Sequence, residues 1–556
     1  MTPLFSSKER NNIFLRMSQS VYDVLVIGGG ITGAGIALDA ASRGLKVLLV
    51  DKQDFAAGTS SRSTKLVHGG LRYLKNLEFG VVAEVGKERA VVYENAPHVT
   101  TPERMLLPIY RGGTFGKLST SLGLRVYDWL AGVKRSERRT MLNAKQALGR
   151  EPLLMQDGLL GGGMYVEYRT DDARLTLETV KKAVQLGAVA INYADVETLL
   201  VNENGKVRGA RITDRTATGD EQRCEVTARY VVNAAGPWVD ELRVLDRSRT
   251  GKTLLLTKGV HLVFDGARFS LGQAVYFDTP DGRMVFAIPR DGKTYVGTTD
   301  TRYEGDLHHP RIEREDREYL LKAINSMFPN VRLTAADVES GWCGLRPLIR
   351  QEGKSPSEIS RRDEIFESPS GLLSIAGGKL TGYRKMAESV VDRIADRMRS
   401  SGQPNVPPCQ TRNMRLSGGD TGGGEGFADY VAAWTAEGER LGLSRTEAEW
   451  LVRRYGSNVP TVLAYYAPKV DSRTTMPAVL RIALDYAIEH EMAVSPLDFF
   501  MRRTGMLLFD IDSVRNWHTQ VTERMAAQLG YTSEERRIYE QELARELAYC
   551  EGIGSL

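Results

Sequence analysis

Three side chains suited to proton transfer and anion binding lie close together in the chain, at His68, Arg72 and Tyr73. Histidine exchanges a proton near neutral pH, and arginine presents a planar set of donors that matches a phosphate or a carboxylate. A run of hydroxyl residues precedes them: Thr59, Ser60 and Ser61. Small residues let a loop run close along a cofactor. The segment therefore predicts a cofactor loop beside a substrate clamp, and a basic loop with a structural tyrosine is the alternative.

The segment that must position this loop is a glycine-rich turn just before it. Gly28-x-Gly30-x-x-Gly33 follows the apolar run 24–27, and a second apolar run ends at Asp51. The first glycine permits a tight turn, the second lets a pyrophosphate approach the backbone, and the third lets helix and strand pack closely. Asp51 stands where the ribose-binding acid of such folds is expected. This order predicts a dinucleotide site, and a glycine-rich turn without a ligand is the alternative.

Two further features of the sequence suit the same site. Ile31 and Thr32 open the helix after the turn, where unpaired N–H groups are available to phosphates. The apolar strand 231–234 ends in Ala235 and Gly236. Small residues at a strand end let the backbone come close to a bound nucleotide.

A third strand and turn follow much later in the chain. The apolar run 372–376 leads into a Gly-Gly pair that ends at Gly378, and Lys379, Leu380 and Thr381 come directly after it. The N–H groups of such a helix start suit the edge of an isoalloxazine ring, where negative charge develops when a flavin is reduced.

The order of elements predicts an α/β fold, a Rossmann-like nucleotide-binding domain with an inserted, mostly antiparallel β domain and an all-α C-terminal domain. Hairpin signals at 281–282 and 291–292 place the antiparallel layer in the second half of the region before residue 400. We expect the boundaries to be an N-terminal extension at 1–20, the interleaved nucleotide-binding and cap domains at 21–400, a Gly/Pro-rich linker at 401–426 and a helical domain at 427–556.

Length and composition limit the class of protein. A chain of 556 residues is too long for one core, and its net charge of +4 is nearly balanced, which disfavours a nucleic-acid-binding protein. Its four cysteines are scattered without metal-ligand spacing, so neither a disulfide framework nor a metal site is expected. We find no signal peptide and no apolar run of about 18 residues that would span a bilayer. These features predict a cytoplasmic protein.

From residue 22 to residue 388 the sequence resembles the FAD-dependent, respiratory sn-glycerol-3-phosphate dehydrogenases, within the flavoproteins related to glutathione reductase and D-amino-acid oxidase. Gly382 stands where threonine is often expected in this family. The resemblance rests on these segments: Ile-Gly-Gly-Gly-Ile-Thr-Gly-Ala-Gly at 27–35, Thr-Ser-Ser at 59–61, Lys-Leu-Val-His-Gly-Gly-Leu-Arg-Tyr-Leu at 65–74, Asn-Ala-Ala-Gly-Pro-Trp at 233–238, Gly-Thr-Thr-Asp at 297–300, Gly-Leu-Arg-Pro-Leu at 344–348 and Gly-Gly-Lys-Leu-Thr-Gly-Tyr-Arg-Lys at 377–385.

The resemblance implies a non-covalently bound FAD and the oxidation of sn-glycerol 3-phosphate to dihydroxyacetone phosphate, with electrons passed to a membrane quinone. Arg72 and Arg346 match substrate-binding arginines of the family, and Tyr73 is expected to add a hydroxyl group to the phosphate site. Arginine suits this role because its planar fork binds a phosphate through two parallel hydrogen bonds. A structural salt bridge is the alternative role for Arg346.

Hydride transfer from the substrate also requires a group that takes the hydroxyl proton. His261 is the leading candidate for this base, and His68 is its competitor. A buried core histidine is the alternative role for His261. Lys379 is expected to support the developing oxyanion or the reduced flavin.

The family also implies a homodimer that is peripheral to the membrane. Apolar residues recur at helical spacing between 115 and 130, with basic residues among and after them, and a basic amphipathic helix with a tryptophan can lie in a bilayer interface. An ordinary half-buried helix is the alternative.

Two other functions stay open at this point. A glycerol-3-phosphate oxidase would share the same substrate chemistry and pass electrons to O2, and the absence of an extra inserted segment favours the dehydrogenase. A flavin-binding regulatory or interaction protein would use the helical domain for docking, and the set of candidate catalytic side chains disfavours it.

Overall fold

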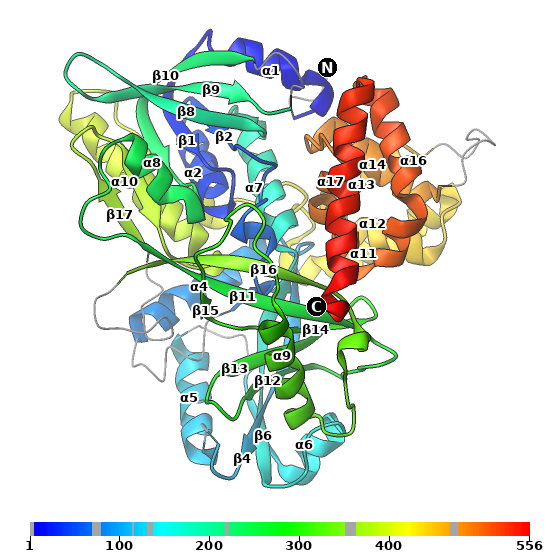
Figure 1. Cartoon of the computed structure of the whole chain (residues 1–556). Helices are drawn as coiled ribbons and strands as arrows, with labels where there is room; N and C mark the ends of the chain where they lie inside the picture. The colour runs from blue at the N-terminus through cyan, green and yellow to red at the C-terminus, as the bar shows by residue number, and fades with distance from the viewer. Residues whose placement is uncertain are drawn as a thin grey trace.

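Two β-sheets and a helical C-terminal region make up the chain (Figure 1). The computed structural model describes residues 5–68, 79–113, 116–130, 137–216, 222–350, 363–466 and 476–556. Within these residues, no helix is both long and apolar enough to cross a membrane.

The first sheet contains eight strands among the described residues, in the order β17-β18-β10-β1-β2-β7, with β9 pairing both β10 and β8. Its centre is parallel: β1 lies between β10 and β2, and β10 also pairs with β18. The strands span Val21–Ile27 (β1), Val47–Val50 (β2), Val189–Ile191 (β7), Ala194–Val201 (β8), Val207–Asp214 (β9), Arg223–Asn233 (β10), Glu364–Glu367 (β17) and Leu373–Ala376 (β18).

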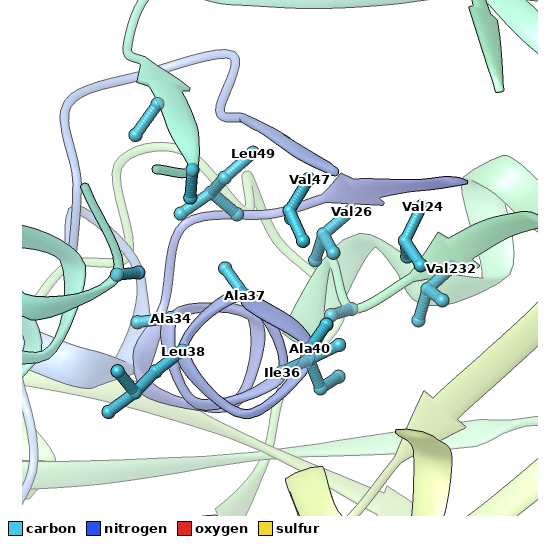
Figure 2. Packing of buried hydrophobic residues seen from close by; sticks show 14 of the residues in the cluster. Val24, Val26, Ala34, Ile36, Ala37, Leu38, Ala40, Val47, Leu49 and Val232 are labelled. Carbon is cyan, nitrogen blue, oxygen red and sulfur yellow. The ribbon is translucent and has the colours of Figure 1, made fainter. Parts of the chain in front are cut away.

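The core of this sheet explains why the glycine-rich segment folds as a strand and a helix. Alternate residues of β1, Val24 and Val26, are fully buried against α2 (Ile31–Ser42), whose Ile36 and Ala37 are also fully buried. Figure 2 shows these side chains meeting between the helix and the strands. Burial of each large aliphatic side chain contributes about 1.5–3 kcal/mol. Helices α7 (Asp172–Gln185) and α10 (Tyr383–Ser400) pack against α2 and complete the layer.

The second sheet contains ten strands among the described residues and is antiparallel except for one parallel pair, β12 with β4. Strand β11 pairs with β16 along its whole length, from Leu254 opposite Ile349 to Phe264 opposite Val338. The strands span Leu66–Val67 (β3), Thr100–Tyr110 (β4), Thr140–Asn143 (β5), Leu159–Thr170 (β6), Leu254–Asp265 (β11), Ala274–Asp278 (β12), Met284–Arg290 (β13), Lys293–Gly297 (β14), Thr301–Arg302 (β15) and Val338–Ile349 (β16).

Several helices accompany this second sheet in the lower half of Figure 1. A helix is found where the basic amphipathic segment predicts one, and it spans Lys117–Leu130 (α5). Residue 115, at the start of the predicted segment, lies outside the described residues. The other helices of this part span Phe79–Asn95 (α4), Ala144–Arg150 (α6) and Arg314–Met327 (α9). Helix α8 (Val239–Leu245) lies with the first sheet instead, where it contacts β18.

The C-terminal region is helical and stands beside both sheets (Figure 1). A capping box opens α12: the Ser444 side chain accepts a hydrogen bond from the Glu447 backbone, and the Glu447 carboxylate accepts from the Ser444 backbone. The helices span Gly423–Leu441 (α11), Arg445–Tyr455 (α12), Val459–Leu463 (α13), Ala478–His490 (α14), Met506–Phe509 (α15), Ile511–Leu529 (α16) and Ser533–Gly552 (α17), with a π-helix at Asp498–Arg503 (η9).

The chain before β1 contacts this C-terminal region. Helix α1 (Arg10–Met17) follows a short turn in which the Ser7 hydroxyl donates to the Ala493 carbonyl at 2.6 Å. The segment 401–422, before α11, is also packed: Leu416 is buried, and its N–H donates to the Asn95 carbonyl at 3.0 Å. The boundaries at 20 and at 401–426 remain sequence-based predictions.

The α/β class with an antiparallel insertion and a helical C-terminus, predicted from the sequence, is confirmed. Both predicted hairpins form, because 281–282 joins β12 to β13 and 291–292 joins β13 to β14. The sequence indicates an ordinary helix over 495–503 within the C-terminal domain, but residues 498–503 form a π-helix.

Candidate active site

A cavity of about 310 Å³ lies between the two sheets. The carboxyl ends of the parallel strands β1, β2, β10 and β18 line one part of it, and residues of β11 and β16 line another. Ligands of open α/β folds bind outside the carboxyl ends of the parallel strands. The cavity therefore joins the predicted dinucleotide site to the antiparallel sheet.

The glycine turn is too tightly packed for any side chain. Gly28 has φ +112°, and a Cβ there would lie 2.5 Å from the Ala234 carbonyl oxygen. A Cβ on Gly33 would lie 1.8 Å from the Gly28 oxygen, which gives this glycine the close helix–strand packing that its spacing predicts. Gly30 caps α2, and a Cβ on it would lie 3.1 Å from the Ser60 hydroxyl.

The N-terminus of α2 opens into the cavity, and Gly30, Ile31 and Thr32 line it. The Ser60 hydroxyl accepts a hydrogen bond from the Ile31 N–H at 2.9 Å. N–H groups at a helix start attract a phosphate because they have no partner within the helix. These donors suit the pyrophosphate of a dinucleotide.

Asp51 follows β2 and lines the same cavity. Its carboxylate accepts from the Gly29 N–H at 2.6 Å and from the Gln53 N–H at 2.8 Å. Burial raises the pKa of Asp51 to about 6, against the opposing effect of these two backbone hydrogen bonds. The position at the strand end suits a ribose-binding acid.

The predicted cofactor loop is anchored from both sides. Thr59 and Ser61 bound the short helix η2 (Thr59–Ser61), and the Thr59 hydroxyl donates to the Leu345 carbonyl of β16 at 2.6 Å. Further along the loop, Lys65 forms a buried ion pair with Asp172 at 2.7 Å. Because Asp172 begins α7, this ion pair fixes the end of the loop to that helix.

The ends of β10 and β18 contribute backbone to the cavity wall. Ala235 and Gly236 line it after β10, and Gly236 has φ +56°. After β18, Gly378 has φ +84°, and a Cβ there would lie 2.4 Å from the Met386 sulfur. Lys379 and Leu380 line the cavity next to this turn.

His68 lies against the β18 turn. Its N–H donates to the Thr381 hydroxyl at 3.1 Å, and that hydroxyl donates to the His68 carbonyl at 3.2 Å. The His68 ring also lies edge-on to Phe286, with ring centroids 6.0 Å apart. Both residues of the pair, His68 and Thr381, line the cavity, so the loop after β3 and the loop after β18 meet there.

His261 on β11 is almost completely buried, and its ring stacks on Trp342 of β16 with centroids 4.7 Å apart. Its Nε2 lies 3.1 Å from the Thr64 hydroxyl, and its Nδ1 has no hydrogen-bond partner among the described residues. Burial holds the pKa of His261 well below its usual value, and the positive charges of Arg346 and Lys65 lower it further. The imidazole is therefore held in its neutral form near pH 7.

Arg346 lies four residue pairs from His261 along the β11–β16 ladder, because Arg346 is opposite Thr257 and His261 is opposite Trp342. Its guanidinium covers Gly259, where a Cβ would lie 2.2 Å from Nη2. Nη2 donates to the Thr298 hydroxyl at 2.8 Å, and Nη1 lies 3.3 Å from Asp300. The strand pairing thus brings a histidine and an arginine into one cavity.

Two predicted substrate residues, Arg72 and Tyr73, lie outside the described residues. The other predicted site residues meet around the cavity, apart from Gly33 and Ser61, which pack beneath its wall. Trp342 and Thr64, which contact the His261 ring, were missed by sequence reasoning, because no local pattern relates either of them to His261.

The residues present fit FAD. A glycine cradle closes the turn, a helix start offers N–H donors, and an acid ends the second strand, all beside one cavity. A second helix start, η6 (Leu380–Gly382), lies at another part of the cavity wall. These are the donor types that the two ends of this dinucleotide require.

Comparisons with known proteins agree with this fit. Residues 23–384 match the family described as FAD dependent oxidoreductase, and residues 409–536 match the C-terminal domain of alpha-glycerophosphate oxidase. The aerobic glycerol-3-phosphate dehydrogenases of Bacillus subtilis and Staphylococcus epidermidis are 57% and 53% identical, over 98% and 97% of this chain and 98% and 96% of theirs.

A solved structure gives the same result in three dimensions. The glycerol-3-phosphate dehydrogenase of Bacillus halodurans, complexed with FAD, superposes with a TM-score of 0.85 at 50% identity, covering 98% of each chain. An L-alpha-glycerophosphate oxidase of Mycoplasma pneumoniae, 19% identical, shares the fold with a TM-score of 0.53 over 70% of this chain and 99% of its own. The chain belongs to the FAD-dependent oxidoreductase family and, within it, to the aerobic glycerol-3-phosphate dehydrogenases.

Proposed function

We propose that this chain oxidises sn-glycerol 3-phosphate to dihydroxyacetone phosphate and passes the electrons to a membrane quinone. The observation that carries the proposal is the meeting of His261 and Arg346 in the cavity that the FAD-binding strand ends also line. The substrate loses a hydride from C2 and a proton from the C2 hydroxyl. The quinone receives the two electrons and takes up two protons.

FAD, when bound, supplies the hydride acceptor. Arg346 supplies a fixed cation for the substrate phosphate, and Arg72 and Tyr73 are proposed to complete that clamp. The hydrogen bonds of Arg346 to Thr298 and its closeness to Asp300 hold the guanidinium over Gly259. A charge held in place in this way binds a phosphate without a further ordering cost.

His261 is proposed to accept the proton of the C2 hydroxyl. Its neutral ring and its stacking on Trp342 support this role, because a base must be unprotonated and fixed in orientation. His68 stays the alternative base, since it lines the same cavity. Lys379 is proposed to stabilise negative charge that develops on the substrate oxygen or on the reduced cofactor.

An anaerobic titration of the holoenzyme tests the proposal. Addition of sn-glycerol 3-phosphate should bleach the flavin absorbance, and glycerol without the phosphate should not. A soluble quinone analogue added next should restore the oxidised spectrum. No bleaching by glycerol 3-phosphate would rule out the substrate, and bleaching without recovery would rule out the quinone.

An oxidase activity is the competing function, because the C-terminal domain matches a family described for alpha-glycerophosphate oxidase. The two functions differ in the electron acceptor alone. Hydrogen peroxide formed in proportion to substrate oxidised in air would establish the oxidase.

Association with a membrane surface and with a second copy of the chain also belongs to the proposal. Helix α5, an amphipathic segment with basic residues, is the proposed membrane contact. Liposome flotation of the Trp129→Glu, Leu130→Glu double variant should show reduced binding, and undiminished binding would remove α5 from the proposal.

The second copy of the chain is tested by light scattering of the protein as it elutes from a size-exclusion column. The measured mass should be that of a homodimer.

A further inference from the structure

A buried cluster of charged side chains joins the C-terminal region to the loop that follows Asp51. Arg502 and Arg503, at the end of the π-helix η9, both bind the carboxylate of Asp54. The Arg502 Nε lies 2.5 Å from Oδ2 of Asp54, and the Arg503 nitrogens lie 2.6 and 2.9 Å from its two oxygens. Asp54 and Arg503 are at most 1% exposed, so water screens this contact little.

The same cluster reaches a second loop, the one between β7 and β8. Asn192 donates to Asp54 at 2.9 Å, and the Tyr193 hydroxyl donates to Asp498 at 2.6 Å. Asp498 also accepts from Arg502 at 2.6 Å. Each charged group therefore has an opposite charge and at least one further hydrogen bond.

The two loops held by this cluster form the cavity wall at the adenosine end. Asp51 and Gln53 line the cavity, as does Ala194 at the end of the neighbouring loop, where β8 begins. The Ala194 N–H donates to the Asp51 carbonyl at 2.7 Å, and the Tyr193 N–H donates to the Gln53 carbonyl at 2.9 Å. Tyr193 takes a positive φ of 51°, which a non-glycine residue adopts only where its surroundings impose it.

A contribution to the stability of the fold does not by itself explain why these charged residues are buried here. Removing ions from water costs several kcal/mol each, and replacing a buried ion pair by apolar residues is often neutral or stabilising. Burial would raise the pKa of Asp54, but the charges of Arg503 and Arg502 hold it at about 2. The cluster thus keeps a charged, directional contact at the point where two cavity loops meet.

We propose that Arg502 and Arg503 are positioning residues for FAD: by holding Asp54, they fix the Asp51–Gln53 loop in the conformation that binds the adenosine end of the cofactor. The C-terminal region then determines cofactor affinity without touching the cofactor. This role concerns FAD binding and is independent of the substrate and of the electron acceptor.

The experiment measures the dissociation constant of FAD from the full-length apoprotein by the change in flavin fluorescence. In Arg502→Met, the FAD dissociation constant should rise by about tenfold or more, because Asp54 and Asp498 lose a shared partner. In Arg502→Lys, which keeps the charge but can bind only one of the two carboxylates well, the rise should be smaller.

The matched control is Asp316→Asn, which breaks a buried ion pair with Lys258 in the antiparallel sheet, 2.6 Å long and at most 5% exposed. Urea unfolding of each apoprotein measures its stability. The control should lose stability while its FAD dissociation constant stays within about twofold of the wild type.

Two outcomes would overturn the positioning role. One is an Arg502→Met apoprotein with wild-type FAD affinity, and the other is an equal loss of affinity in Asp316→Asn. Should Arg502→Met fail to fold, Arg502→Lys decides, and an unchanged FAD dissociation constant in that variant overturns the proposal. Flavin bleaching by glycerol 3-phosphate in the wild type is a separate measurement, and its result tests only the proposed function. The FAD dissociation constants test only the positioning role.

Discussion

The two parts of the cavity recognise their proposed ligands by different means. The wall at the parallel sheet uses backbone, since Gly28 and Gly33 exclude side chains and α2 presents N–H groups. The wall at the antiparallel sheet uses the side chains of His261 and Arg346. A change in chain conformation should remove all the backbone contacts to the cofactor together. Replacing one side chain of the other wall should remove the role of that side chain alone. The predictions below test that difference.

The largest effect is expected from Gly33→Ala in the backbone site. The new Cβ would lie 1.8 Å from the Gly28 oxygen, so α2 must move away from β1. Such overpacking costs about 1–3 kcal/mol or more, and the displaced helix start should no longer retain FAD. FAD content after gel filtration and the Tm measure the two effects.

The control for this variant is Gly149→Ala in α6, where a Cβ would meet nothing within 4 Å. It should keep its FAD and gain up to about 1 kcal/mol, because alanine is the better helix former. Full FAD content and an unchanged Tm in Gly33→Ala would contradict the backbone account.

The backbone site was predictable because its information is local. The spacing of Gly28, Gly30 and Gly33, followed by Asp51, specifies turn, helix and strand within one short segment. The strand ends at Ala235 and Gly378 were found by the same reasoning, since small residues after an apolar run mark a close approach of backbone.

The contacts that complete the site were not predictable, because they join residues far apart in sequence. No local pattern relates Lys65 to Asp172, or Trp342 to the His261 ring on which it stacks. Arg502 reaches Asp54 across 448 positions, from a π-helix that the sequence presents as an ordinary helix.

In the side-chain site, His261→Gln should cause the next largest effect. Loss of a general base slows its step by about 10²–10⁴-fold. Stopped-flow absorbance of flavin reduction measures that step in enzyme saturated with substrate. The paired variant His68→Gln should stay within about tenfold of wild type, and the reverse order of the two variants would transfer the role of base to His68.

Arg346→Ala should lower kcat/KM for glycerol 3-phosphate by about 100-fold, because removing a partly buried cation from a charge pair costs about 2–5 kcal/mol. Its FAD content should not change, in contrast to Gly33→Ala. The exposed Arg350, near the same strand end, supplies the control Arg350→Ala, which should keep its kcat/KM. Unchanged kcat/KM in Arg346→Ala would restore the structural role for this residue.

The smallest effect, a pH dependence, separates Asp51 from the rest of the backbone site. Asp51 carries the carboxylate assigned to the ribose of the cofactor, and burial raises its pKa to about 6. The carboxylate accepts hydrogen bonds from a ribose hydroxyl better than the protonated acid does. Because the acid form predominates below pH 6, FAD affinity should fall as the pH decreases from 7.5 to 5.

The size of the fall is limited to about tenfold, since a site that binds FAD only in one protonation state loses a factor of ten per pH unit below its pKa. Titration of apoprotein with FAD at several pH values measures the curve. Asp51→Asn cannot titrate, so its affinity should be weaker than wild type at pH 7.5 and nearly constant down to pH 5. A wild-type curve parallel to that of Asp51→Asn would assign the pH dependence to other groups and leave Asp51 only a structural contact with Gly29.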